Sequence, residues 1–316
     1  MKICIVSKFP PIEGGIASRT YWQVRQLLEE GHEVTVVTNS GATEREYCVE
    51  GCQEHLRGLT ERYQLELHDV CGEAPWHIPS GPDHLERLLS VLLSVLSRKS
   101  FAVIESGYLV PYGIAAGLAS MFTGIPHVVR HGGSDLAKFL PHPQYGELLT
   151  RILRQAEKVI TDEHSEPLLR SSGAITELAP VYEPDSKLFA PRHTPRSAEV
   201  PVYAYIGKIN YYWKRRGLDK LIEWYGASST NVALRIVGQG AGRAGFEHWM
   251  AAQGLSNPVS VEPFVPPWRV PDLLAAVDGV FCLSAGDPIT SDSMLQREAR
   301  AMKRIVLESL PASQAL

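Results

Sequence analysis

Cationic side chains follow the end of a predicted strand at residues 202–206. Lys208 comes directly after this strand, and a basic run at residues 214–216 precedes a predicted helix at residues 218–225. Lysine and arginine close to the N-terminus of a helix attract anions. The pattern therefore favours a site for a phosphate or diphosphate group. The alternative is a basic surface that only faces solvent.

Glycines mark further positions where the chain could approach such an anion. Gly238 and Gly240 follow a predicted strand at residues 232–237, and Gly14 and Gly15 precede the first predicted helix. Glycine lets the backbone come close to a ligand, although it is also common in simple turns. In a parallel sheet both strand ends of the second half lie at the same edge, so we expect the cations and these glycines to face one crevice.

The elements that must position these residues alternate between strand and helix along the chain. Such alternation predicts an α/β fold with two Rossmann-like domains, each a doubly wound and mostly parallel sheet. A proline-rich polar segment at residues 191–201 predicts a linker between an N-terminal domain, residues 1–190, and a C-terminal domain, residues 202–316. Because ligand sites favour clefts between domains, we expect the two domains to face one. Predicted strands lie at residues 2–6, 33–38, 64–70, 101–105, 126–130, 158–161, 202–206, 232–237, 259–262, 279–283 and 305–307, and predicted helices at residues 17–30, 83–97, 112–122, 145–155, 166–172, 218–225, 246–253, 271–276 and 292–302.

Composition and charge argue against several classes of protein. The net charge of −4 and the pI near 6.3 disfavour a nucleic-acid-binding protein, because such domains are usually basic. Five scattered cysteines are typical of a reducing compartment, so we expect a cytoplasmic protein. The sequence shows no signal peptide and no run of about 18 apolar residues. Cys48 and Cys52 near His55 could form half of a metal site, but no second pair stands at zinc-like spacing, and we expect no metal ion.

Taken together, the motifs resemble glycosyltransferase family 4, which consists of retaining nucleotide-sugar glycosyltransferases with the GT-B fold. The resemblance covers nearly the whole chain, and the motifs stand in the order of the family. The similar segments are Pro10–Ala17, where the family has a glycine loop under the donor diphosphate, Gly31–Val37, His131–Asp135, Pro180–Pro191, Gly207-Lys208, Arg216-Gly217, Val237–Gly240 and Glu298–Met302. Each motif alone is weak, whereas five or more in order indicate a common fold.

The resemblance implies transfer of a sugar from a UDP- or GDP-sugar donor to a hydroxyl acceptor, with retention at the anomeric carbon. The acceptor would be a glycan, a lipid carrier or a small molecule held by the N-terminal domain, and a lipid carrier would bring peripheral membrane contact. No cofactor and no nucleic acid is implied, and cationic side chains would neutralise the diphosphate without a metal ion. The implied catalytic residues are His131, Lys208 and Arg216, and the implied donor-binding residues are Gly14, Gly15, Lys214, Gly238, Gly240, Thr290 and Glu298.

Departures from the family pattern keep other interpretations open. Lys208 stands where the family usually has arginine, which retains the charge but loses the bidentate fork. Thr290 stands where the family has a second glutamate, and the sequence stops before the family's last strands and helices. An incomplete second domain is therefore expected, and the alternative function is that of an impaired or truncated relative that only binds nucleotide sugar. Glu298 could also be an exposed helix residue paired with Arg300.

A dinucleotide-dependent enzyme is the weaker alternative. Residues 240–245 form a literal G-x-G-x-x-G that follows a strand and opens a helix, and Glu262 lies 20 residues after Gly242. The dinucleotide fingerprint belongs to the first β-α unit of its domain, however, whereas this copy lies in the second.

Overall fold

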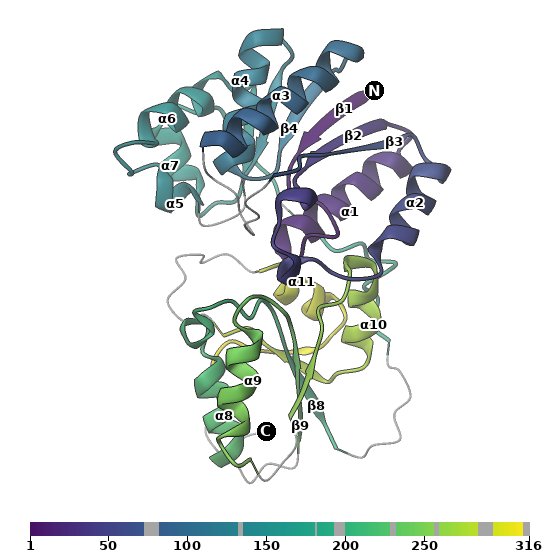
Figure 1. The fold of residues 1–316 in the computed structure, drawn as a ribbon, viewed down its shortest axis with the longest axis vertical. Coiled ribbons are helices and arrows are strands. Elements are labelled where there is room, and N and C mark those ends of the chain that lie inside the picture. The colour runs from purple at the N-terminus through teal and green to yellow at the C-terminus, as the bar shows by residue number, and fades with distance from the viewer. Residues whose placement is uncertain are drawn as a thin grey trace. The chain divides into compact units, whose positions relative to one another are not determined.

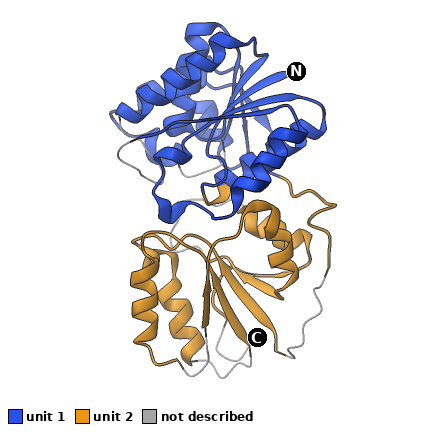
Figure 2. Cartoon of the chain, turned by 45° about the vertical axis from the view of Figure 1, so that its right-hand side comes forward, with its two compact units in different colours: residues 1–12, 16–182, 288–291 blue, residues 13–15, 183–287, 292–316 orange. Residues whose placement is uncertain are grey.

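The computed structural model describes residues 1–72, 82–131, 135–180, 182–192, 200–227, 232–255, 259–283 and 293–311. The chain divides into two compact units (Figure 2). Unit 1 contains Met1–Ile12 and Ile16–Tyr182, and unit 2 contains Glu13–Gly15 together with most of the chain from Glu183 onward. The division between Tyr182 and Glu183 falls upstream of the predicted linker, of which residues 193–199 lie outside the described part.

Unit 1 is built on a parallel sheet whose described strands have the order β3-β2-β1-β4-β5-β6-β7 (Figure 1). β1 lies inside this sheet, paired with β2 on one side and β4 on the other. Ile3–Val6 are all buried, as expected for a parallel strand that is covered on both faces. The strands are β1 Lys2–Val6, β2 Glu33–Thr38, β3 Leu65–Asp69, β4 Val103–Ser106, β5 His127–Arg130, β6 Lys158–Thr161 and β7 Thr176–Leu178.

Helices cover both faces of this sheet. α1 and α2 lie on one face, and α3 and α4 lie on the other (Figure 1). The buried residues of α1 recur at helical spacing, from Ala17 through Tyr21 and Val24 to Leu28, so one stripe of the helix faces the sheet. The helices are α1 Gly15–Glu29, α2 Cys52–Arg62, α3 Pro82–Arg98, the π-helical turn η3 Leu109–Gly113, α4 Ile114–Thr123, α5 Asp135–Phe139, α6 Gly146–Gln155 and α7 Glu166–Ser171.

Unit 2 repeats this architecture on a smaller scale. Its described strands have the order β10-β9-β8-β11-β12, all parallel. Helices α8 and α9 lie on one face, and α10 and α11 lie on the other (Figure 1). The elements are β8 Val202–Ile206, the 3₁₀ turn η4 Trp213–Arg216, α8 Leu218–Ala227, β9 Ala233–Val237, α9 Arg243–Ala251, β10 Val259–Glu262, the 3₁₀ turn η5 Pro267–Arg269, α10 Val270–Ala275, β11 Gly279–Phe281, α11 Met294–Ala301 and β12 Ile305–Leu307.

The predicted fold class is confirmed, with two parallel sheets that carry helices on both faces. Three elements were missed: α2, α5 and β7. The polar segment that contains α2 was expected to be irregular. The helix buries only Cys52, Leu56 and Leu59, so its sequence has few apolar residues that could reveal it. Among the described helices, none combines the length and the apolar character needed to cross a membrane.

Strand order reverses at one point in each sheet. In unit 1 the chain moves from β1 through β2 to β3 and then returns to the other side of β1 with β4. In unit 2 it moves from β8 through β9 to β10 and returns beside β8 with β11. Ligands of open α/β sheets bind outside the carboxyl ends of the strands at such reversals. The loops after β8 and β11 in unit 2, and after β1 and β4 in unit 1, are therefore where functional residues are expected.

Candidate active site

Lys208 lies at the reversal point of the unit 2 sheet, directly after β8. The preceding residue is fixed to the neighbouring strand, because the Gly207 N–H donates to the Val237 carbonyl at 3.1 Å. The Lys208 side chain runs against the backbone of Gly14, which belongs to the same unit. A Cβ atom placed on Gly14 would lie 2.7 Å from Lys208 Cε and 3.1 Å from Nζ. A side chain at this position would push the end of Lys208 aside, and the φ of +106° favours glycine.

Electrostatic coupling ties Lys208 to two charged neighbours of unit 2. Burial lowers the pKa of the Lys208 ammonium; the Glu13 carboxylate opposes this shift, and the Arg216 guanidinium adds to it. Burial also raises the pKa of Tyr205 to about 12, with Arg216 lowering it and Cys282 and Glu13 raising it. Arg216 itself is exposed, at the end of η4. The sequence interpretation grouped Lys208, Arg216 and Gly14 but missed Glu13, whose only sequence signal is its place before the paired glycines.

Lys214 is directed elsewhere. Its Nζ lies above the Trp213 ring, 5.4 Å from the centroid, and 5.9 Å from the centroid of Trp249. Trp213 is buried and packs edge-on against Phe246 at a centroid distance of 5.2 Å. A cation over an aromatic face gains about 0.5–1 kcal/mol at an exposed site. The structure therefore gives Lys214 a contact within unit 2 that is separate from the Glu13, Lys208 and Arg216 group.

The glycines after β9 serve the packing of the chain on itself. A Cβ on Gly238 would lie 2.1 Å from the Gly207 carbonyl oxygen, and a Cβ on Gly242 would lie 1.9 Å from that of Asn210. Gly240 has a φ of +135°, which disfavours a side chain. Gly238 and Gly242 therefore let the loop after β9 pack closely against the loop that carries Lys208.

We expect Gly242→Ala to destabilise unit 2, because its new Cβ meets backbone atoms that cannot rotate away. The expected loss is about 1–3 kcal/mol in the free energy of unfolding. Gly245, three residues later in α9, has open space beside it, with no heavy atom within 4 Å of the place a Cβ would take. Gly245→Ala should therefore be neutral or stabilise by about 0.5–1 kcal/mol. Urea denaturation of both variants measures the difference, and equal midpoints would contradict this packing.

The same contacts disfavour the dinucleotide interpretation. In that fingerprint the second glycine gives room for the pyrophosphate and the third allows close packing of helix on strand. Here the Asn210 carbonyl occupies the space beside Gly242, and Gly245 has open space beside it. Glu262, the expected ribose ligand, instead accepts two hydrogen bonds from Arg235, at 2.8 and 2.6 Å.

Glu298 lies on α11, which begins with a capping box between Ser293 and Gln296. The alternative of an exposed helix glutamate is wrong, because the side chain is buried. Glu298 is 4% exposed, and Arg300 pairs with Glu308 at 2.7 Å. Gly15 lies near the start of the same helix, since a Cβ placed on it would be 3.8 Å from Met294 Sδ. Thr290 lies outside the described residues.

His131 follows β5 in unit 1 and is enclosed by protein. Its side chain is 2% exposed, and its Nε2 lies 3.3 Å from Asp135 Oδ1. The imidazole faces the buried Asp135. The Asp135 carboxylate accepts from the Leu136 N–H at 3.1 Å and from the Leu109 N–H at 2.5 Å. The acid therefore links α5 to the turn after β4.

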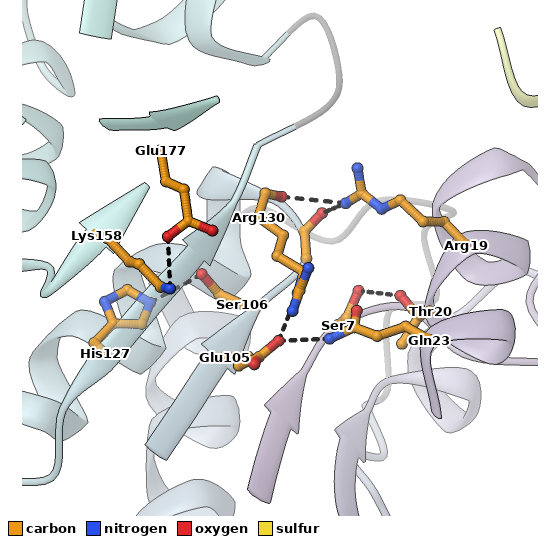
Figure 3. Close-up of polar contacts among 11 residues, drawn as sticks. Ser7, Arg19, Thr20, Gln23, Glu105, Ser106, His127, Arg130, Lys158 and Glu177 are labelled. Atoms are coloured by element: carbon orange, nitrogen blue, oxygen red, sulfur yellow. Dashed lines mark hydrogen bonds and ion pairs between the residues drawn. The ribbon is translucent and has the colours of Figure 1, made fainter. Parts of the chain in front are cut away.

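A polar network fills the reversal point of the unit 1 sheet (Figure 3). Arg19 of α1 donates to the carbonyls of Gly107 and Arg130, the second at 3.3 Å. Its burial lowers the pKa of the guanidinium to about 10, although Asp135 raises it; Arg130 adds to the lowering. Glu105 accepts from Arg130 at 2.7 Å and from Gln23. Sequence reasoning missed this network, since its members Arg19, Gln23, Glu105 and Arg130 belong to none of the recognised motifs.

In unit 1, the surroundings of His55 and Cys52 do not favour metal binding. His55 Nε2 is hydrogen-bonded to the Tyr21 hydroxyl at 2.8 Å. Burial, with a smaller contribution from Cys48, raises the pKa of Cys52 to about 12, so that its thiol stays protonated at neutral pH. Within the described ranges, no three His, Cys, Asp or Glu side chains converge in a way that could hold a metal ion.

Comparisons with known proteins agree with this architecture. Residues 14–167 match the family of the glycosyl transferase 4-like domain. A crystal structure of Anabaena HepE in complex with UDP-glucose aligns with a TM-score of 0.69 at 17% identity, over 97% of this chain and 79% of that one. Sucrose-phosphate synthase from Thermosynechococcus elongatus aligns with a TM-score of 0.68 at 18% identity, over 97% and 80%. A glycosyltransferase from Rickettsia africae aligns with a TM-score of 0.61 at 13% identity, over 96% and 78%.

No curated protein matches the sequence of this chain. At these identities the solved structures establish the fold, and the family match covers residues 14–167. The chain therefore carries a glycosyl transferase 4-like domain at residues 14–167 and has the GT-B fold along nearly all of its length.

Proposed function

We propose that this glycosyltransferase moves a sugar from a UDP- or GDP-sugar to a hydroxyl acceptor, with retention at the anomeric carbon and without a metal ion. The single observation that carries the proposal is the placement of Lys208. It lies at the reversal point of the unit 2 sheet, against Gly14 and electrostatically coupled to Arg216. UDP-glucose in the HepE complex is consistent with a nucleotide-sugar donor here.

The chemistry requires charge stabilisation at the leaving group. When the bond between the sugar and the diphosphate breaks, negative charge grows on the diphosphate oxygens. Fixed cations next to those oxygens stabilise the transition state more than the ground state, and one such group is worth about 3–4 kcal/mol by comparison with other electrostatic sites. Lys208 and Arg216 would supply this charge, and the buried Glu298 would accept hydrogen bonds from the nucleotide's ribose. His131 would lie near the reacting carbon.

The direct test is a transfer assay with a panel of UDP- and GDP-sugars and with glycan, lipid-linked and small hydroxyl acceptors. We expect one donor to be consumed and the product to keep the donor's anomeric configuration, as read from proton coupling constants in NMR spectra. Inversion would contradict the retaining mechanism. A donor that raises the melting temperature by mass action but is never consumed would favour the alternative of a relative that only binds nucleotide sugar.

Metal removal gives a second expected result. Because Lys208 and Arg216 would neutralise the diphosphate, dialysis against EDTA should leave the initial rate of transfer within about twofold, far from the loss expected when a Lewis acid is removed. Adding Mg²⁺ or Mn²⁺ should also change the initial rate by no more than about twofold. A rate that collapses with EDTA and returns with one of these ions would overturn the metal-independent mechanism.

A further inference from the structure

A buried carboxylate lies in the same part of unit 2 as the two cations. Glu13 is 1% exposed, and it is the first residue of the short segment Glu13–Gly15 that belongs to this unit. The next residue, Gly14, is the one whose backbone contacts the end of the Lys208 side chain. Burying an ionised carboxylate is costly unless positive charge compensates it. Lys208 provides that compensation, since Glu13 is the carboxylate coupled to it.

The site without this carboxylate would hold two like charges. Lys208 and Arg216 repel each other, and Arg216 and Cys282 also act on the Tyr205 phenol. Arginine keeps its proton in nearly any protein environment, whereas a buried lysine loses its proton readily. Burial and Arg216 both act against the charged form of Lys208, and Glu13 acts in its favour. Of these three influences on Lys208, that of the carboxylate is the one that favours its charged form.

We propose that Glu13 is a positioning residue that acts through Lys208: it keeps the lysine charged at the place where the donor's diphosphate binds. The inference rests on the proposed function, because it assigns Lys208 to the diphosphate. This role of Glu13 explains how a lysine can stay charged at position 208. An arginine at that position would keep its charge without a nearby carboxylate. The role of Glu13 also makes donor use sensitive to pH in this chain, through a residue that does not itself touch the reacting atoms.

The test is the pH dependence of kcat/KM for the donor in the full-length Glu13→Gln variant. Without the carboxylate, the folded-state pKa of Lys208 falls further, so the charged form is lost at a lower pH. We expect the alkaline limb of the profile to move down by about one pH unit, which is a roughly tenfold loss on that limb. At the acid end of the profile, where the charged form of Lys208 is favoured in both proteins, the rates should agree within about twofold. An unchanged limb would overturn the proposal.

Two further variants exclude a purely structural explanation. In Lys208→Arg the side chain stays charged at every accessible pH, so the alkaline limb should be absent, and Glu13→Gln added to it should shift nothing. Lys208→Arg also tests the proposal if Glu13→Gln fails to fold. If the alkaline limb of the kcat/KM profile persists in Lys208→Arg, that limb does not come from the titration of Lys208, and the proposal is wrong. Glu13→Asp should restore most of the wild-type profile. The surface variant Glu147→Gln, from an exposed pair with Arg151, serves as the matched control.

Failure of this inference can be told apart from failure of the proposed function. If Lys208→Ala leaves donor binding unchanged in isothermal titration, the donor site itself is misplaced. If Lys208→Ala weakens donor binding while Glu13→Gln shifts no limb, the donor site stands and only the role of Glu13 is rejected.

Discussion

Replacing Lys208 by alanine should lower kcat/KM for the nucleotide-sugar donor by about 10²–10³ while the protein stays folded. The side chain ends against Gly14 at the reversal point of the unit 2 sheet, where a diphosphate would meet it. An ammonium in that position would stabilise the departing diphosphate, and alanine removes that charge. Arg216→Ala should produce a loss of the same kind. Initial rates over a range of donor concentrations measure both.

Controls for this result come from the same unit. Lys220 is exposed on α8, two residues beyond the start of that helix, and Lys220→Ala should keep kcat/KM within about threefold, as expected for a surface charge. Lys214→Ala should lower kcat/KM by less than about tenfold, which is between the effects of Lys208→Ala and Lys220→Ala. The reason is that the Nζ of Lys214 lies over Trp213 and Trp249. If Lys208→Ala behaved like Lys220→Ala, the assignment of the diphosphate to Lys208 would be wrong.

Replacing Arg19 by alanine should destabilise unit 1 by about 3–5 kcal/mol, the usual cost of leaving a buried charge without its partner. Arg19 is 5% exposed, donates to the carbonyls of Gly107 and Arg130, and faces the fully buried Asp135. Its removal would leave that carboxylate and two carbonyls poorly compensated between α1, β4 and β5. Chemical denaturation followed by circular dichroism gives the loss as a lower transition midpoint.

Two comparisons separate charge from packing in this result. Arg19→Met keeps much of the side-chain volume, so it should recover little of the lost stability if the charge is what matters. Arg151→Ala breaks an ion pair with Glu147 in which both side chains are more than 70% exposed, and it should cost no more than about 1 kcal/mol. Equal losses for Arg19→Ala and Arg151→Ala would show that the network at the reversal point does not hold unit 1 together.

Much of the fold could be predicted from the sequence, because its strands are apolar runs bounded by turn residues. β8, β10 and β12 were predicted at the residue ranges found. α2 was not predicted, because a polar helix with a narrow buried stripe has little apolar periodicity to detect. β7 is a three-residue edge strand, of which only Thr176 is even partly buried, and so short a segment carries no alternation.

The candidate site was harder to predict than the fold. Lys208 and Gly14 could be assigned to one ligand because each follows a strand end or precedes a helix. The enclosure of His131 depends on Asp135 folding back toward the turn at Leu109, and spacing along the chain does not reveal that contact. The burial of Glu13 was equally hidden, because a glutamate before two glycines reads as an ordinary polar loop residue.

The central claim is that cationic side chains of unit 2 hold a nucleotide's diphosphate. Isothermal titration of the wild-type protein with UDP, UMP and uridine, and with GDP, GMP and guanosine, tests it without any acceptor. For the preferred base we expect the diphosphate to bind at least tenfold more tightly than the monophosphate, about 1.4 kcal/mol. In the Lys208→Ala/Arg216→Ala double variant this ratio should approach one. Equal affinity of the nucleoside diphosphate, monophosphate and free nucleoside for the wild-type protein would contradict the account.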